Sequence, residues 1–164
     1  MITDMKLSER GKLALIEFEG EVLTPYKCQA GVWTIGVGHT GSLQAIGVVT
    51  PIAQTPSITL EQSRQLLDAD LKTYEEAVNH LVDVHLEQHQ FDALVSFCFN
   101  VGTQALKTST LLKRINAKGH KDSIANAFEM WCKGGEPKKT IEGLLKRRKQ
   151  EAKMFNEGIY PKNV

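Results

Sequence analysis

The sequence predicts an α+β fold, with a short antiparallel sheet early in the chain and helices through most of the remainder. Within residues 31–41 (GVWTIGVGHTG), the larger apolar residues fall at every second position, which is typical of a half-buried strand. From Thr59 onward, apolar residues instead recur at helical spacing. With 164 residues, 41% of them hydrophobic and 24% charged, the chain can bury the core of one compact enzyme domain.

The first expected element is a helix over residues 8–18, with Ser8 as its N-cap. A sheet region follows at about 22–58, where Gly, Thr and Pro are frequent. Within it, residues 41–57 are apolar but rich in turn formers. They predict an irregular or lid-like segment.

A long helix is expected over about 59–81, because Thr59 and Gln62 have the spacing of a capping box. The apolar residues that then recur at helical spacing are Leu67, Leu71, Tyr74, Val78 and Leu81. The helix would have roughly 22 residues and span about 33 Å. We expect it to join a lobe of residues 12–58 to a lobe of residues 82–164, which also includes the first helix. A polymer could lie in a groove between these lobes.

The remaining chain predicts a mostly helical second lobe. The expected helices cover residues 87–99, 108–117, 121–132 and 139–156. Gly102, Gly119 and the pair Gly134–Gly135 supply the expected helix stops.

Glu19 is the first candidate catalytic residue. On the first helix it shares a face with Leu15 and Ile16, whereas Glu17 and Glu21 lack that pair of neighbours. Burial beside apolar side chains raises the pKa of a carboxyl, so Glu19 could hold a proton near neutral pH and act as a general acid. The alternative is a helix-terminal glutamate with no function.

Cys28 and Thr34 bracket an expected hairpin turn at residues 29–31, which places them on neighbouring strands. The spacing from Glu19 to Cys28 to Thr34 resembles the catalytic triad of the phage-type lysozymes, the endolysins of glycoside hydrolase family 24. The same resemblance extends to later motifs: QFDALVSF at 90–97, FNVG at 99–102, STLL at 109–112 and GLLKRR at 143–148.

The resemblance implies a lysozyme-like fold and a muramidase, which hydrolyses the β-1,4 bond between N-acetylmuramic acid and N-acetylglucosamine in peptidoglycan during host cell lysis. Glu19, Cys28 and Thr34 would be its catalytic residues, although Asp is more usual than Cys at the middle position. The family positions implied to bind the saccharide are Thr40, Phe99, Asn100 and Thr110.

Cys28 leaves three roles open: a polar group that binds water, a thiolate base, or a nucleophile that attacks the sugar. The other cysteines, Cys98 and Cys132, are widely spaced and are expected to be structural. No cysteine or histidine spacing indicates a metal site, and no cofactor is expected.

Arg148 falls on the apolar stripe of the last expected helix. A buried arginine usually needs an anionic partner. We therefore hypothesise that Arg148 pairs with Glu19 or orders its surroundings, while Lys146, Arg147 and Lys149 form a solvated face. The alternative is that the stem of Arg148 packs and its guanidinium extends to water.

His39 lies on the core-directed side of the expected strand, and Asp70 on the long helix is a possible partner for it. We expect this pair to stabilise the fold rather than to act in catalysis.

Composition and charge exclude several classes. A net charge of +1 gives no reason to expect binding to nucleic acid. The first 20 residues carry many charges and no long apolar run occurs, so we expect no signal peptide or membrane anchor. The chain is therefore expected to stay in the host cytoplasm, and nothing in the sequence demands more than a monomer. The resemblance then implies that it acts in the periplasm or cell wall after a holin or similar factor permeabilises the membrane.

Two other functions compete with hydrolysis. A lytic transglycosylase also needs one catalytic glutamate and no obligatory second carboxylate, so the missing Asp at position 28 favours it. A non-catalytic peptidoglycan-binding protein of the same fold is the second alternative.

Overall fold

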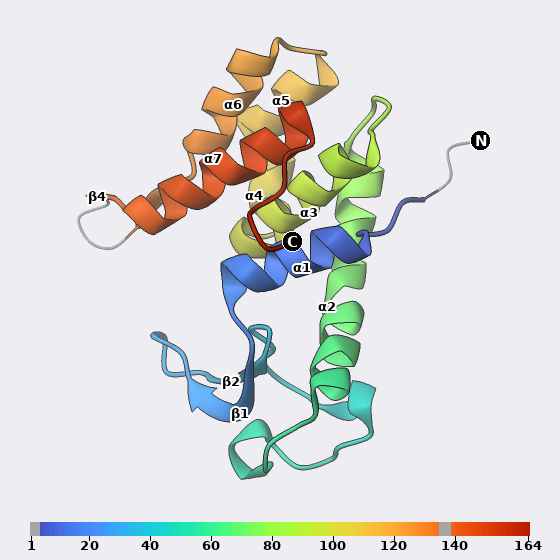
Figure 1. Cartoon of the computed structure of the whole chain (residues 1–164), viewed down its shortest axis with the longest axis vertical. Coiled ribbons are helices and arrows are strands. Elements are labelled where there is room, and N and C mark those ends of the chain that lie inside the picture. Colours follow the sequence, from blue (N-terminus) through green and yellow to red (C-terminus); the bar gives the residue numbers. More distant parts are fainter. Residues whose placement is uncertain (1–3, 135–138) are drawn as a thin grey trace. The chain divides into compact units, whose positions relative to one another are not determined.

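The computed structural model describes residues 4–134 and 139–164 (Figure 1). The chain divides into two compact units. The hairpin unit is Ile16–Lys72, and the helical unit combines Met1–Leu15 with Thr73–Val164. Among the described residues, no helix is both long enough and apolar enough to cross a bilayer.

The hairpin unit contains the predicted antiparallel pair, β1 (Val22–Lys27) and β2 (Trp33–Gly36). The Gly31 amide donates to the Cys28 carbonyl over 2.9 Å, and the Cys28 amide donates to the Val32 carbonyl over 3.0 Å. Gly31 has a φ of 78°, the left-handed conformation that ends this three-residue hairpin loop. The predicted turn at 29–31 is therefore confirmed.

The predicted alternation of burial along β2 is wrong. Trp33 is exposed, but the next two residues, Thr34 and Ile35, are both buried. A second tight turn then returns the chain, because Ile35 and His39 exchange backbone hydrogen bonds of 3.0 and 2.9 Å. The strand therefore ends at Gly36 with both of its faces covered.

The segment that follows is irregular, as predicted. Two short 3-10 helices, η1 (Gln44–Ile46) and η2 (Ile52–Gln54), are its regular elements. Leu43 and Ile52 belong to the hydrophobic core of the hairpin unit, and that core consists of Ile35, Leu43, Ile52, Ile58 and Leu66. These two apolar residues of the segment are therefore core residues, and Ile46 and Val48 pack against the same core.

Helix α2 (Leu60–Leu81) matches the predicted long helix to within one residue. The Thr59 amide donates to the Gln62 side chain over 2.9 Å, and the Gln62 amide donates to the Thr59 hydroxyl over 3.0 Å. These reciprocal bonds form the predicted capping box. Two of the orphan amides at the helix start are satisfied in this way.

Helix α1 (Glu9–Glu19) carries the predicted cap, since the Gly11 amide donates to the Ser8 hydroxyl over 2.9 Å. Asp92, which is fully buried, anchors this start. Its carboxylate accepts from the Ser8 amide at 3.1 Å and from the Tyr160 hydroxyl at 2.6 Å. The beginning of α1 and the end of the chain are therefore tied to the same aspartate.

The helical unit differs from the predicted element order in several places. Its helices are α3 (Gln88–Val101), α4 (Thr103–Thr108), α5 (Thr110–Asn116), α6 (Lys121–Glu129) and α7 (Glu142–Glu157). The helix predicted over 108–117 is present as α5 with slightly shorter ends, and Ser109 caps it by accepting from the Leu112 amide. Helix α4, which precedes it, was not predicted. A short hairpin, β3 (Lys133–Gly134) with β4 (Lys139–Thr140), occupies positions predicted as a helix stop and a helix start. Gly135, predicted as part of that stop, lies outside the described residues.

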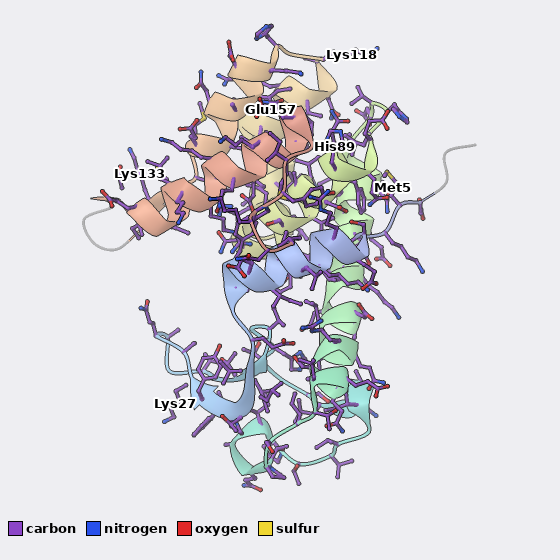
Figure 2. The ribbon with its side chains drawn as sticks, in the orientation of Figure 1. Met5, Lys27, His89, Lys118, Lys133 and Glu157 are labelled. Atoms are coloured by element: carbon purple, nitrogen blue, oxygen red, sulfur yellow. The ribbon has the colours of Figure 1, made fainter. Side chains whose placement is uncertain are left out.

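Aromatic side chains fill the core of the helical unit. Phe97 on α3 makes edge-to-face contacts with Phe128 at 5.6 Å and Trp131 at 5.9 Å between ring centroids. Helix α7 packs against both α3 and α6 (Figure 1). The end of α7 is also tied to α3, where the His89 ring lies 2.8 Å from the Met154 carbonyl (Figure 2).

Candidate active site

Glu19 is the last residue of α1 and is half-buried, one turn after the fully buried Leu15. Gly20 ends the helix with a φ of 80°, and its amide donates to the Ile16 carbonyl over 2.7 Å. Glu17, two residues earlier, is exposed. The predicted difference in environment between Glu19 and Glu17 is therefore present.

Glu21 has a structural role that the sequence did not indicate. Arg64 on α2 donates to both of its oxygens at 2.9 Å, and the Ser63 hydroxyl donates at 2.7 Å. The bond from Arg64 contributes most to holding the pKa of Glu21 below its ordinary value, and partial burial opposes it. This carboxylate joins the start of the hairpin to α2.

Cys28 follows directly after β1, at the start of the turn, and its side chain is partly exposed. The Val32 amide, and after it the Ala30 amide, lowers the pKa of the Cys28 thiol by stabilising the thiolate. Desolvation opposes this effect, and the Thr34 hydroxyl adds to it. The turn thus provides a small nest of N–H groups beside the sulfur.

Thr34 is buried in β2 and pairs with Tyr26, two positions before the Cys28–Val32 backbone pair. Its hydroxyl donates to the Val32 carbonyl over 2.9 Å, and the same hydroxyl contacts Cys28. A threonine has one hydroxyl hydrogen, so it can donate to the carbonyl or to a thiolate, but not to both. We call Cys28 and Thr34 the hairpin pair.

His39 and Asp70 form the predicted pair, with the histidine Nδ1 2.7 Å from a carboxylate oxygen. Its Nε2 lies 2.8 Å from the Ser42 carbonyl, so both nitrogens face acceptors. The hydrogen bond to Asp70 is the main cause that raises the pKa of His39. Burial opposes this shift, and the bond to the Ser42 carbonyl adds to it. Thr40, the next residue, is exposed.

Arg148 is fully buried, and its anionic partner in this structure is Glu151. Its guanidinium also donates to the Trp131 carbonyl at 2.9 Å and to the Asn100 side chain, and it lies 5.1 Å from the centre of the Phe97 ring. The alternative in which it extends to water is wrong. The predicted pairing with Glu19 stays a prediction.

Arg147 is also buried, which corrects its predicted place on a solvated face. It donates to Glu151 at 3.2 Å and to the Ser96 carbonyl at 3.1 Å, while the Ser96 hydroxyl donates to Glu151 at 2.5 Å. We call Ser96, Asn100, Arg147, Arg148 and Glu151 the arginine cluster. Glu151 was missed, although it stands three and four residues after the two arginines, which is the spacing of helical ion pairs.

The remaining predicted saccharide-binding residues lie in the helical unit. Phe99 is half-buried and its ring is 5.1 Å from that of Tyr74, while Asn100 is exposed at the end of α3. Thr110 is half-buried at the first position of α5. Their contact with a saccharide stays a prediction.

The other two cysteines are buried, and desolvation raises the pKa of Cys98 to about 12. Cys98 therefore cannot ionise readily at neutral pH. Within residues 4–134 and 139–164, no group of His, Cys, Asp and Glu side chains could hold a metal ion.

Comparison with known proteins places these features in a family. The phage lysozyme family model matches residues 16–151. The endolysin of Salmonella phage P22 is 40% identical over 151 residues, which cover 92% of this chain and 98% of that protein. The solved endolysin of Escherichia coli O157:H7 phage FAHEc1 has a TM-score of 0.88 and 37% identity, over 99% of this chain and 100% of that one. The muramidase domain of SpmX from Asticaccaulis excentricus has a TM-score of 0.80 and 35% identity, over 92% and 97% of the two chains. The chain therefore belongs to the phage lysozyme family.

Proposed function

We propose that Glu19, Cys28 and Thr34 carry out the reaction of this peptidoglycan hydrolase. The enzyme is a muramidase, a glycoside hydrolase that cleaves the β-1,4 bond between N-acetylmuramic acid and N-acetylglucosamine. The observation that supports the proposal most is the hairpin pair. Its sulfur is partly exposed, lies beside backbone N–H groups and contacts a hydroxyl.

Glu19 is the general acid of the proposed reaction. A protonated carboxyl at this position donates its proton to the leaving glycosidic oxygen while the sugar passes through an oxocarbenium-like transition state. Its place at the end of α1 supports this role, because Glu19 is half-buried there whereas Glu17 on the same helix is exposed. General acid catalysis contributes about 10²–10⁴ to a rate.

Cys28 and Thr34 hold the attacking water. The Cys28 thiolate accepts one proton of the water, and the oxygen of the water bonds to the anomeric carbon. The glycosidic bond breaks as Glu19 donates its proton to the leaving oxygen. Afterwards the thiol loses its proton to solvent and Glu19 regains one. Thr34 supports both states, because its hydroxyl can donate to the Val32 carbonyl while Cys28 is a thiol and to the sulfur when Cys28 is a thiolate.

The competing transglycosylase reaction uses no water, so it needs no base at position 28. The products therefore distinguish the two reactions. We expect digestion of purified sacculi to release muropeptides with reducing ends, each cut adding one water by mass spectrometry. Anhydromuramyl ends would instead identify a transglycosylase.

Glu19→Gln is the decisive variant in this experiment, and Glu17→Gln is its matched control on the same helix. Loss of product in the first and retention in the second would support Glu19 as the acid. Equal product release by both variants would contradict its role. If the wild-type protein binds sacculi and releases nothing, the protein is a non-catalytic binder and the proposal fails.

Endolysins act on the cell wall, and a chain made in the cytoplasm needs a route to that substrate. We propose that it acts as a monomer after a holin or similar factor permeabilises the inner membrane. Expression with and without such a factor tests the route, because lysis should require both proteins. Lysis by this chain alone would contradict it.

A further inference from the structure

A long stretch of the hairpin unit lacks acidic and basic residues apart from His39. Between Lys27 and Glu61 the sequence contains no Asp, Glu, Lys or Arg, although these residues make up 24% of the whole chain. Many positions in this stretch are nevertheless exposed. Protein surfaces are normally rich in mixed charges, so a neutral surface of this extent indicates contact with a neutral partner.

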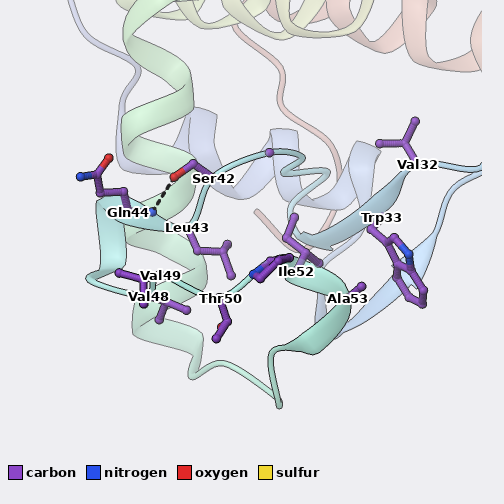
Figure 3. Close-up of a pocket in the computed structure, with 12 residues that line it drawn as sticks. Val32, Trp33, Ser42, Leu43, Gln44, Val48, Val49, Thr50, Ile52 and Ala53 are labelled. Atoms are coloured by element: carbon purple, nitrogen blue, oxygen red, sulfur yellow. Dashed lines mark hydrogen bonds between the residues drawn. The ribbon is translucent and has the colours of Figure 1, made fainter.

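A pocket of about 570 Å³ lies in this neutral surface, lined entirely by residues of the hairpin unit. Its lining includes the buried core residues Leu43 and Ile52. Figure 3 shows Trp33 at one end of the lining and Val48 and Val49 at the other, with Ile52 between them in the view. The volume is within the range of small-ligand sites.

Three apolar side chains at this pocket are unusually exposed. Val49 is 95% exposed, Val32 is 46% exposed and Trp33 is 40% exposed. The Lys27 ammonium lies 5.4 Å from the centre of one Trp33 ring, so that face is partly occupied by the lysine. An exposed indole beside a pocket is a typical platform for a flat apolar surface such as a sugar ring.

Polar atoms with spare hydrogen-bonding capacity accompany the apolar lining. The Ser42 hydroxyl accepts from the Gln44 amide over 3.1 Å, which leaves its hydrogen able to donate to a ligand. Thr55 uses its single hydrogen on the Pro51 carbonyl at 2.8 Å, so Thr50 must be the donor in the 2.8 Å contact between the two threonines. The Thr50 oxygen can then accept from a ligand.

These groups match an acetamido substituent. Such a group has a carbonyl that accepts, an N–H that donates and an uncharged methyl. The Ser42 hydroxyl can donate to the carbonyl, and the Thr50 oxygen can accept from the N–H. The methyl can pack against the apolar residues Leu43 and Ile52. We infer that this pocket binds an N-acetylated amino sugar of the glycan strand, as a contact separate from the reacting bond. The inference rests on the proposed function, because it takes the glycan as the substrate.

Strand geometry separates the pocket from the hairpin pair. Trp33 and Thr34 are successive residues of β2, and successive side chains of a strand leave opposite faces. Trp33 lines the pocket, whereas Thr34 contacts Cys28. One strand can therefore bind a neighbouring part of an insoluble polymer through one face while the other face serves the reaction.

The lining favours a sugar over a lipid surface. A protein that docks on anionic lipids uses clustered Lys and Arg, and none lines this pocket.

The test is a titration of the ¹⁵N-labelled Glu19→Gln full-length protein with tri-N-acetylchitotriose, followed by amide and indole NMR signals. We expect saturable shifts at the Trp33 indole and at the Ser42 and Thr50 amides. Adding Trp33→Ala or Ser42→Ala should weaken this binding by about tenfold or more. Leu60→Ala, an exposed apolar residue of the same unit outside the pocket, should bind as the parent does.

The variants are then compared, with Glu19 intact, on sacculi and on a short soluble muramyl oligosaccharide. We expect Trp33→Ala to lower the ratio of the first activity to the second by several-fold. Equal losses of activity on sacculi and on the soluble oligosaccharide would place the pocket among the subsites next to the reacting bond, and would overturn the inference. So would absent pocket shifts, or binding of Trp33 to phosphatidylglycerol vesicles with no response to the sugar. If wild-type protein releases no muropeptides, the proposed function fails instead, whatever the titration shows.

Discussion

The arginine cluster and the hairpin pair use polar groups in opposite ways. In the cluster, two buried guanidinium groups converge on Glu151, and carbonyl, hydroxyl and amide oxygens take further hydrogens. In the hairpin pair, a partly exposed thiol contacts one hydroxyl whose hydrogen has two alternative acceptors. The cluster is held in one arrangement, whereas the pair can change its protonation with little rearrangement.

This difference shows that the polar groups that stabilise the fold are distinct from the groups proposed for catalysis. Among the described residues, no buried side-chain nitrogen or oxygen lacks a hydrogen-bond partner. Charges that stabilise the fold are enclosed with complete partners, since a buried unpaired charge is costly. The sulfur proposed for catalysis is instead reachable from solvent, as its exchange of protons with water requires.

Thiol reactivity should show the largest contrast. At pH 7 the thiolate of Cys28 should exceed that of Cys98 by at least about a thousandfold, because the pKa of Cys28 is lowered and that of Cys98 is raised to about 12. Alkylation by iodoacetamide, followed by peptide mass spectrometry, should label Cys28 first and abolish activity in parallel. Full labelling of Cys28 with activity intact would exclude every direct role for its sulfur.

Removing Glu151 should give the largest loss of stability. Glu151→Ala leaves two buried guanidinium groups without their shared carboxylate, at a cost of about 3–5 kcal/mol. Urea unfolding measures the change, with Glu157→Ala as the exposed control on the same helix. A loss below about 1 kcal/mol would mean that the cluster contributes no more than a surface ion pair.

His39→Asn should destabilise the hairpin unit by about 1–3 kcal/mol, while turnover of the folded enzyme changes little. The pKa of His39 is raised in the folded state, so the contribution of its pair with Asp70 is complete below about pH 6.5 and is lost as pH rises through the folded pKa. Thermal unfolding from pH 5 to 9 should therefore show the two proteins converging. A constant difference across that range would refute the ion pair.

The smallest effect is expected at Glu21. Glu21→Gln weakens the bonds from Arg64 and Ser63 and should cost about 1 kcal/mol at pH 7. Because the folded state lowers the pKa of Glu21, its contribution is complete above about pH 4.5 and is lost as pH falls through the folded value. Unfolding at pH 3 should then differ less between the variant and the wild type than unfolding at pH 7. A larger difference at pH 3 would contradict the sign of this linkage.

Local signals made much of the fold predictable from the sequence. The capping box at Thr59, the cap at Ser8 and the turn at 29–31 are short-range patterns with a physical mechanism, and each is present. The hairpin β3–β4 and helix α4 were missed. In both places, the apolar spacing of the surrounding residues is a stronger signal in the sequence than the bonds or packing contacts that determine the local structure.

The candidate site likewise contains features that local sequence predicts and features that it does not. The placement of Cys28 beside Thr34 follows from a three-residue turn, and the pairing of His39 with Asp70 was expected. The burial of Arg147 and the partners of Glu21 depend on segments far apart in the chain, such as Ser96 and Arg64. Sequence spacing carries little information about such contacts.

The dependence of kcat/KM on pH, measured for the wild type, Cys28→Asp and Cys28→Ser, tests the central claim most directly. If Cys28 accepts the proton of the attacking water, wild-type activity should rise with pH along a limb below about 8.5, the ordinary pKa of a thiol. Cys28→Asp should keep substantial activity and move that limb several units toward acid, while Cys28→Ser should lose about a hundredfold or more. A Cys28→Ser enzyme with wild-type activity and an unchanged profile would contradict the role proposed for the sulfur.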